Sequence, residues 1–124
     1  MKTISKEITL VGATGVGDAI GSERFGISPC ALRAFQIEYV GQGAAAPNIV
    51  ITSELNGLSK TVLTVAAANT NIPLAVLGEL VIDDTGTPVA GVYVSPRLSG
   101  EIEITVDSGD DADPGVIISL LIEE

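Results

Sequence analysis

Regular alternation of apolar and polar side chains recurs along the chain. In residues 2–11, 32–40 and 101–106 the apolar residues fall at even spacing, as Ile4 and Ile8 illustrate, with polar residues between them. A period of two places the apolar side chains on one face of an extended strand and the polar ones on the other. Each of these segments is therefore predicted to be a half-buried β-strand.

A tight turn joins two further predicted strands. Residues 48–55 and 58–68 are rich in β-branched and other apolar side chains, and Asn56 and Gly57 separate them. Asn-Gly tolerates the positive φ angles of a two-residue turn, which is a strong hairpin signal. The pattern predicts a β-hairpin across residues 48–68.

Three more apolar runs complete the strand pattern. Residues 74–83, 89–94 and 116–122 are predicted strands, and turn residues separate them from their neighbours. Residues 12–31 lack clear strand character and are expected to hold a loop or one short helix, because Pro29 disfavours a long helix there.

About eight strands at spacings near ten residues predict an all-β fold, an antiparallel β-sandwich or barrel. Eight strands suit a jelly roll, although spacing alone leaves the strand order open. The whole chain, residues 1–124, is expected to form a single β-sandwich domain. Residues 1–31 are expected to include an extended arm or loop.

The composition excludes or disfavours several classes of function. The formal net charge is −10, so contact with nucleic acid or an anionic membrane surface is disfavoured. The chain has no His, which removes Ser-His-Asp and Cys-His catalysis. Mean hydropathy is +0.47, which suggests more apolar surface than one small domain hides. Partner proteins or further copies of the chain are expected to cover the excess.

One glycine-rich segment invites comparison with a phosphate-binding loop. Gly12 and Gly17 have the spacing of the two P-loop glycines, but Asp18 stands where that motif needs Lys. An aspartate would repel the phosphate. The dinucleotide fingerprint fails too, because Ile20 occupies its third glycine position. A turning loop is the favoured interpretation.

Two groups of acidic residues are candidates for a metal site or a catalytic site. Residues 107–115 form an acidic loop that could supply oxygen ligands to calcium, although the EF-hand spacing is absent. A solvated turn is favoured there, and calcium binding stays open. Glu101 and Glu103 have a spacing compatible with a glycosidase pair, but the solvent face of a strand explains them better. Cys30 is expected to be a small buried residue.

The chain as a whole resembles a known class of proteins. Its size, acidity and strand pattern, together with residues 85–96 and 99–106, resemble small virion structural proteins of tailed bacteriophages, and capsid decoration (cement) proteins most closely. This resemblance implies a β-sandwich or jelly roll, often trimeric, docked on the outer capsid surface to reinforce subunit junctions. It carries over no individual residue. Residues 1–10 could then serve as an arm that orders on docking.

These observations favour a non-enzymatic virion structural protein that binds the major capsid protein or other virion proteins, with a trimer as the favoured homo-oligomer. No catalytic, cofactor-binding or metal-ligating residue is assigned, and no cofactor is expected. The alternative is a carbohydrate-binding or adhesive β-sandwich module of a fibre, which could depend on calcium. Sugar-binding sandwiches usually present aromatic platforms. The chain offers four such rings: Phe25, Phe35, Tyr39 and Tyr93. Phe35 and Tyr39 are expected to lie in the core.

Overall fold

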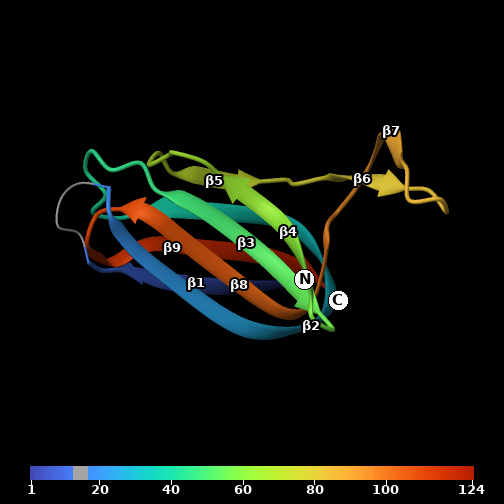
Figure 1. Cartoon of the computed structure of the whole chain (residues 1–124), viewed down its shortest axis with the longest axis horizontal. Helices are drawn as coiled ribbons and strands as arrows, with labels where there is room; N and C mark the ends of the chain where they lie inside the picture. Colours follow the sequence, from blue (N-terminus) through green and yellow to red (C-terminus); the bar gives the residue numbers. More distant parts are fainter. Residues whose placement is uncertain (13–16) are drawn as a thin grey trace.

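In the computed structural model, which describes residues 1–12 and 17–124, the chain is all-β and antiparallel. The described residues form nine strands (Figure 1). Their bounds are β1 Lys2–Leu10, β2 Ala19–Tyr39, β3 Asn48–Leu55, β4 Leu58–Val65, β5 Ile72–Ala75, β6 Glu79–Ile82, β7 Pro88–Val94, β8 Arg97–Gly109 and β9 Ala112–Glu123. The described residues contain no helix that is long and apolar enough to cross a membrane.

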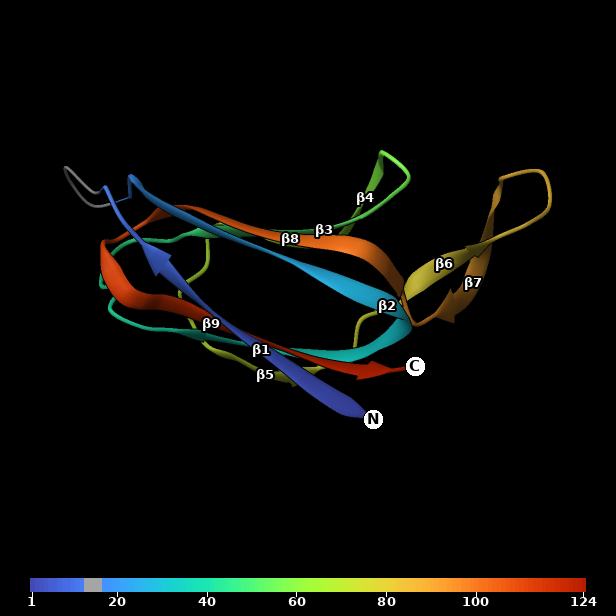
Figure 2. The same ribbon diagram turned by 90° about the horizontal axis from the view of Figure 1, so that it is seen from below.

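Strand β2 links two layers that face each other in Figure 2. Its first half, through Ala31, pairs with β8, while its second half pairs with β9 from Ala31 onward and with β5 at Phe35 and Ile37. One layer therefore has the order β2–β8–β3–β4, and the other has the order β1–β9–β2–β5. We refer to them as the β8 layer and the β9 layer.

This order is that of a jelly roll. If the two halves of β2 are taken as separate strands, eight strands make two four-stranded layers, and every connection except the β3–β4 turn passes from one layer to the other. The antiparallel sandwich expected from the sequence is confirmed. The additional strands β6 and β7 form a separate two-stranded sheet, inserted between β5 and β8.

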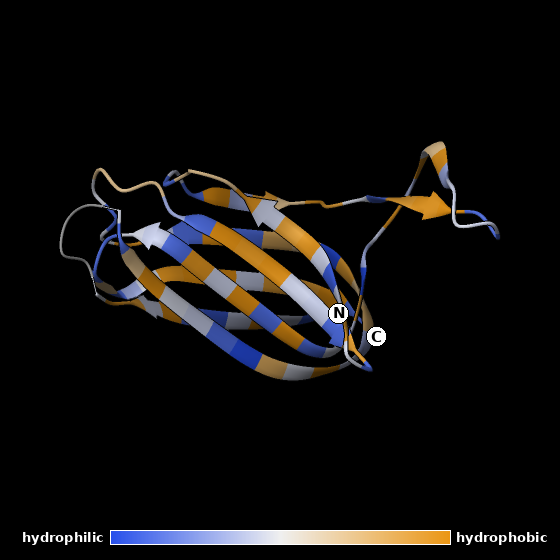
Figure 3. Cartoon of the chain, in the orientation of Figure 1, coloured by the Kyte–Doolittle hydropathy of each residue, from blue (hydrophilic) through white to orange (hydrophobic). Residues whose placement is uncertain are grey.

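Alternating side chains fill the space between the layers. Ile102 and Ile104 of β8 face Ile118 and Leu120 of β9 across an aliphatic core, and each is at most 1 % exposed. The alternation appears as bands along the strands in Figure 3. Full burial of one such side chain stabilises the fold by roughly 1.5–3 kcal/mol, so the period-two pattern fixes which face of each strand points inward.

One prediction about the N-terminal part is wrong and another is confirmed. Residues 19–31 are not a loop or a helix, because they form the first half of β2 and pair with β8. Residues 2–10 form the half-buried strand that their alternation predicts, because β1 pairs with β9 and buries Ile8 and Leu10 completely. Residues 13–16, which belong to the same expected loop, lie outside the described residues.

A second prediction is wrong for residues 74–83. The sequence pattern was consistent with one strand there, whereas the structure ends β5 at Ala75 and begins β6 at Glu79. Leu77 between them packs against the core, while β6 leaves the sandwich. The chain thus uses one apolar run for two different sheets.

Candidate interaction surface

The glycine-rich segment lies where β1 passes into β2. A bridge between Val11 and Ile20 closes the turn, and Gly12 and Gly17 both have positive φ. A phosphate loop delivers its ligand to the first turn of a helix, whereas the described residues from Ala19 onward are strand. The described ends of this segment are therefore a strand-to-strand turn, as favoured from the sequence. The intervening residues 13–16 lie outside the described part.

The carboxylates of the acidic loop are held apart by different partners. Asp107 accepts hydrogen bonds from Asn48 Nδ2 and Ser108 Oγ, each at 2.8 Å, and these bonds lower the pKa of its carboxyl group. Asp113 accepts a bond of 2.9 Å from Thr9 Oγ1 on β1. Within residues 1–12 and 17–124, no three acidic, His or Cys side chains gather as a metal-binding group.

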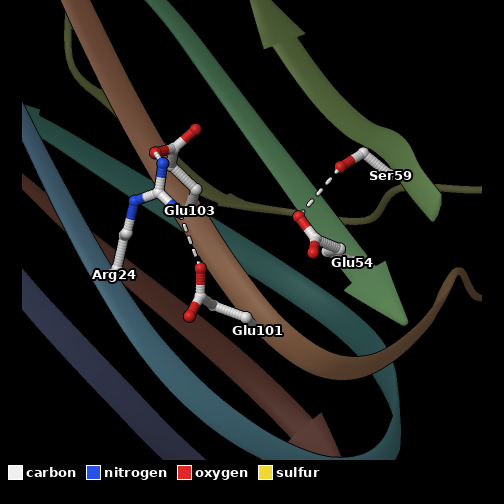
Figure 4. Close-up of polar contacts among 5 residues, drawn as sticks. All are labelled: Arg24, Glu54, Ser59, Glu101 and Glu103. Carbon is white, nitrogen blue, oxygen red and sulfur yellow. Dashed lines mark hydrogen bonds and ion pairs between the residues drawn. The ribbon is translucent and has the colours of Figure 1, made fainter. Parts of the chain in front are cut away.

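Glu101 and Glu103 share one cation on the outer face of the β8 layer (Figure 4). Arg24 Nη1 lies 2.8 Å from Glu101 Oε1, and Arg24 Nη2 lies 2.5 Å from Glu103 Oε2. The hydrogen bond to Glu101 and the charge of Glu103 raise the pKa of Arg24. The pair therefore forms a surface ion-pair cluster, and nearby Glu54 instead accepts a long bond from Ser59.

Cys30 and two of the lysines have structural roles. Cys30 is completely buried, and burial raises the pKa of its thiol. Lys2 pairs with Glu124, and Lys6 lies 4.7 Å above the ring centre of Phe25. The expected burial of Cys30 is thus confirmed.

The four aromatic rings are distributed unequally. Phe35 is 7 % exposed and belongs to the core, while Tyr39 and Phe25 are half-buried against it, so the expected core position of Phe35 and Tyr39 is confirmed. Tyr93 on β7 is 65 % exposed. A flat sugar-binding platform usually needs aromatic faces open to solvent, and in the described chain Tyr93 alone is classed as an exposed ring.

Tyr93 belongs to a hairpin that stands clear of the sandwich. Strands β6 and β7, residues 79–94, pair with each other, with Glu79 opposite Val94 and Leu80 opposite Tyr93. Figures 1 and 2 show this β6–β7 hairpin projecting beyond one end of the two layers. Two-stranded sheets are marginal in water on their own, so a projecting hairpin gains from contact with another surface.

Both faces of the β6–β7 hairpin are apolar. The register places Leu80 and Tyr93 on one face, together with Ile82, and it places Val94 on the opposite face. Ile82 is 62 % exposed, and Figure 3 shows the apolar colouring of β6. Five exposed apolar residues of the hairpin are Leu80, Ile82, Val92, Tyr93 and Val94. A ribbon that is apolar on both faces differs from the solvated outer face of an ordinary antiparallel layer.

The base of the hairpin is anchored to β4 by one ion pair. Lys60 Nζ lies 2.7 Å from Glu79 Oε2. Beside it runs a shallow apolar groove of about 400 Å³, lined by Lys60, Glu79, Leu80, Val81, Ile82 and Val94. The ion pair holds the base of the hairpin next to β4, and the rest of the hairpin projects from the sandwich with its apolar residues exposed.

Sequence reasoning recognised the excess of apolar residues but not its location. Residues 74–83 and 89–94 were both assigned as strands, yet a strand assignment does not say whether the strand joins the main sandwich. One usable signal is a pair of apolar runs joined by the turn residues Asp83–Pro88. Neither run has the alternation of apolar and polar residues that is typical of the sandwich strands. No protein-family model matches this chain, and no curated protein matches it.

Proposed function

We propose that this chain is a non-enzymatic structural protein of a tailed-phage particle. In this proposal it is a capsid decoration protein that binds the major capsid protein on the outer surface of the head and stabilises the shell. The observation that carries the proposal is the exposed, two-faced apolar β6–β7 hairpin, because such surfaces usually mark contact with another subunit of a multi-subunit assembly.

The fold is compatible with this role. Two-layer jelly rolls recur in viral capsid and lectin domains, so the architecture supports both a virion protein and a carbohydrate binder without choosing between them. The hairpin favours the virion protein, since aliphatic side chains such as Ile82 and Val92 suit an apolar protein surface better than a hydroxylated sugar.

The charge supports an exterior location. A net charge of −10 opposes binding to packaged nucleic acid, and it also keeps particles that display many copies apart in solution. The carboxylates Glu101 and Glu103, which a hydrolase could have used, are paired with Arg24 on an open surface. The proposed homo-oligomer is a trimer.

Gold-labelled antibodies raised against the purified chain test the proposed location. Particles produced by the genome that encodes the chain should carry label over their heads, and a deletion of its gene should give heads that lose their contents at lower temperature. Label over tails or fibres would contradict the decoration role, and unlabelled particles would contradict a virion role altogether.

A further inference from the structure

We propose that the β6–β7 hairpin is a self-association surface whose occupant is a second copy of this chain, with the tip of one hairpin against the base of the next copy's hairpin. The inference deepens the proposed function, on which it rests, by naming the surface through which the subunits would join. Three observations carry it: the two apolar faces, the charges at the two ends of the hairpin, and the uncharged stretch between those ends.

The two faces come first. Ile82 and Tyr93 lie on one face and Val94 on the other, and all three are exposed. A partner that covers one side of the ribbon leaves the other in water. In a closed ring built from head-to-tail contacts, each subunit offers its own hairpin to one neighbour and receives the hairpin of the other. The second copy therefore accounts for apolar surface on both sides.

Charges at the two ends of the hairpin are complementary. Asp84 lies in the tip, and Arg97 follows the base at the start of β8. Both side chains are exposed, and neither side chain forms a hydrogen bond or ion pair within residues 1–12 and 17–124. Asp83 beside Asp84 is instead occupied with the turn, where it accepts from Thr85 and Thr87. Tip-to-base contact would pair Asp84 with Arg97 of the second copy, whereas tip-to-tip contact would bring carboxylates together.

Between its base and its tip the hairpin carries no charge. From Glu79 at its base to Asp83 at its tip, β6 carries Leu80, Val81 and Ile82, and β7 carries no charge at all. Two subunits of charge −10 repel each other, so an apolar stretch that is free of charge and has a cation near one end is a favourable place for them to meet.

Light scattering coupled to size exclusion tests the proposal on the full chain over a range of concentrations. Wild type should form a closed oligomer, and Ile82→Thr and Val92→Thr, one on each face, should each weaken association at least tenfold. Leu58→Thr, at an equally apolar residue that is 80 % exposed on the β3–β4 turn, is the matched control and should associate like wild type. Circular dichroism verifies that each variant keeps its strand signal.

Charge reversal tests the orientation. Arg97→Glu and Asp84→Lys should each weaken association, and the double variant should recover it to within about threefold of wild type. Glu7→Lys on β1, which makes the same change of net charge as Asp84→Lys, should not weaken it. A wild type that stays monomeric, hairpin variants that associate normally, or a double variant without recovery would overturn the proposal. Head labelling by the antibody is independent of these results, so a failed surface and a failed function are distinguishable.

Discussion

Gln42 and Asp110 exchange two hydrogen bonds between the β2–β3 connection and the β8–β9 turn. Asp110 N donates to Gln42 Oε1 at 2.8 Å, and Gln42 Nε2 donates to Asp110 O at 3.3 Å. The same Nε2 group donates to Val40 O at 3.0 Å and to Gly115 O at 3.3 Å. Gln42 is 3 % exposed, so its amide replaces water for backbone groups at the end of the sandwich.

Replacing Gln42 with Leu should lower the free energy of unfolding by about 2–4 kcal/mol, because buried backbone groups lose their partner. Urea unfolding at fixed protein concentration measures the change. Gln36→Ala is the matched control, since Gln36 is exposed in β2, and it should change stability by less than about 0.5 kcal/mol. Equal effects of the two substitutions would contradict the role given to Gln42.

Gly100→Ala should be strongly destabilising. Gly100 has a φ of +71°, and an added Cβ would overlap the backbone carbonyl of Glu54 on β3. The expected loss is about 2–4 kcal/mol in thermal or urea unfolding. Gly86→Ala is the control, because Gly86 also has positive φ but open space around it, and it should lose about 1 kcal/mol. A smaller loss at Gly100 than at Gly86 would show that β3 and β8 do not approach as described.

The hairpin turn should weaken in acid. Thr85 Oγ1 donates to the Asp83 carboxylate, with the backbone of Thr87 and Thr85 adding further bonds, and together they lower the pKa of Asp83. Because the pKa of Asp83 is lower in the folded state than in the unfolded state, its ionised carboxylate stabilises the turn at pH values above the ordinary pKa. This stabilisation is lost as the pH falls through the lowered, folded-state pKa, in the range below about pH 4. A carbon-detected NMR titration should show this shift, and Thr85→Val should move the pKa of Asp83 back toward its ordinary value. An unchanged titration would contradict the assigned hydrogen bond.

The Arg24 cluster should respond to salt. Arg24→Met leaves Glu101 and Glu103 as neighbouring carboxylates without their cation, so the free energy of unfolding should fall at low ionic strength. The side chain of Arg24 is 61 % exposed, and the loss should shrink as the screening length falls from about 30 Å at 0.01 M to about 3 Å at 1 M salt. Arg24→Lys keeps the charge and should lose less. A loss independent of salt would indicate packing rather than charge.

Calcium should not stabilise the chain. Asp107 and Asp113 each accept a hydrogen bond from a different strand, so capturing an ion would require both to leave their donors. The melting temperature should be the same with millimolar calcium and with a chelator. A reproducible rise with calcium, which ligand binding to the folded state would produce, would favour the calcium-dependent carbohydrate binder instead.

Much of the sandwich was predictable because its local signals agree with its packing. Asn56 and Gly57 both have positive φ in the structure, and β3 and β4 begin and end around them as the turn chemistry predicts. The even spacing of Ile102, Ile104 and Val106 in β8 likewise matches the buried side of that strand. At these places the turn residues and the apolar pattern specify the same arrangement.

Residues 19–31 were missed because two of their inward positions, Gly21 and Glu23, interrupt the apolar alternation. The half-buried positions of this part of β2 include Gly21 and Glu23, whereas Ile20 points outward and is 60 % exposed. Gly21 is required by contact rather than by conformation, since a Cβ there would overlap Thr9 O on β1. This segment is held as a strand by its pairing with β8. That pairing depends on a distant part of the chain, so the local side-chain pattern of residues 19–31 does not predict it.

The hairpin escaped prediction for a different reason. Apolar content in Leu80 and Ile82 indicates that these side chains will be covered, but it does not say by which molecule. The sequence pattern treats the chain's own core and a neighbouring protein alike. Only the path of β6 away from the layers separates the two, and that path depends on how the preceding strands are arranged.

Strand β2 belongs to both layers over a single run of 21 residues. A tensile load applied to the β8 layer therefore passes into the β9 layer along peptide bonds, and separating the layers would require the backbone of β2 to be stripped from its neighbours on both sides. If the protein were held by one layer and pulled by the other, the two layers would therefore resist the force together and would not separate.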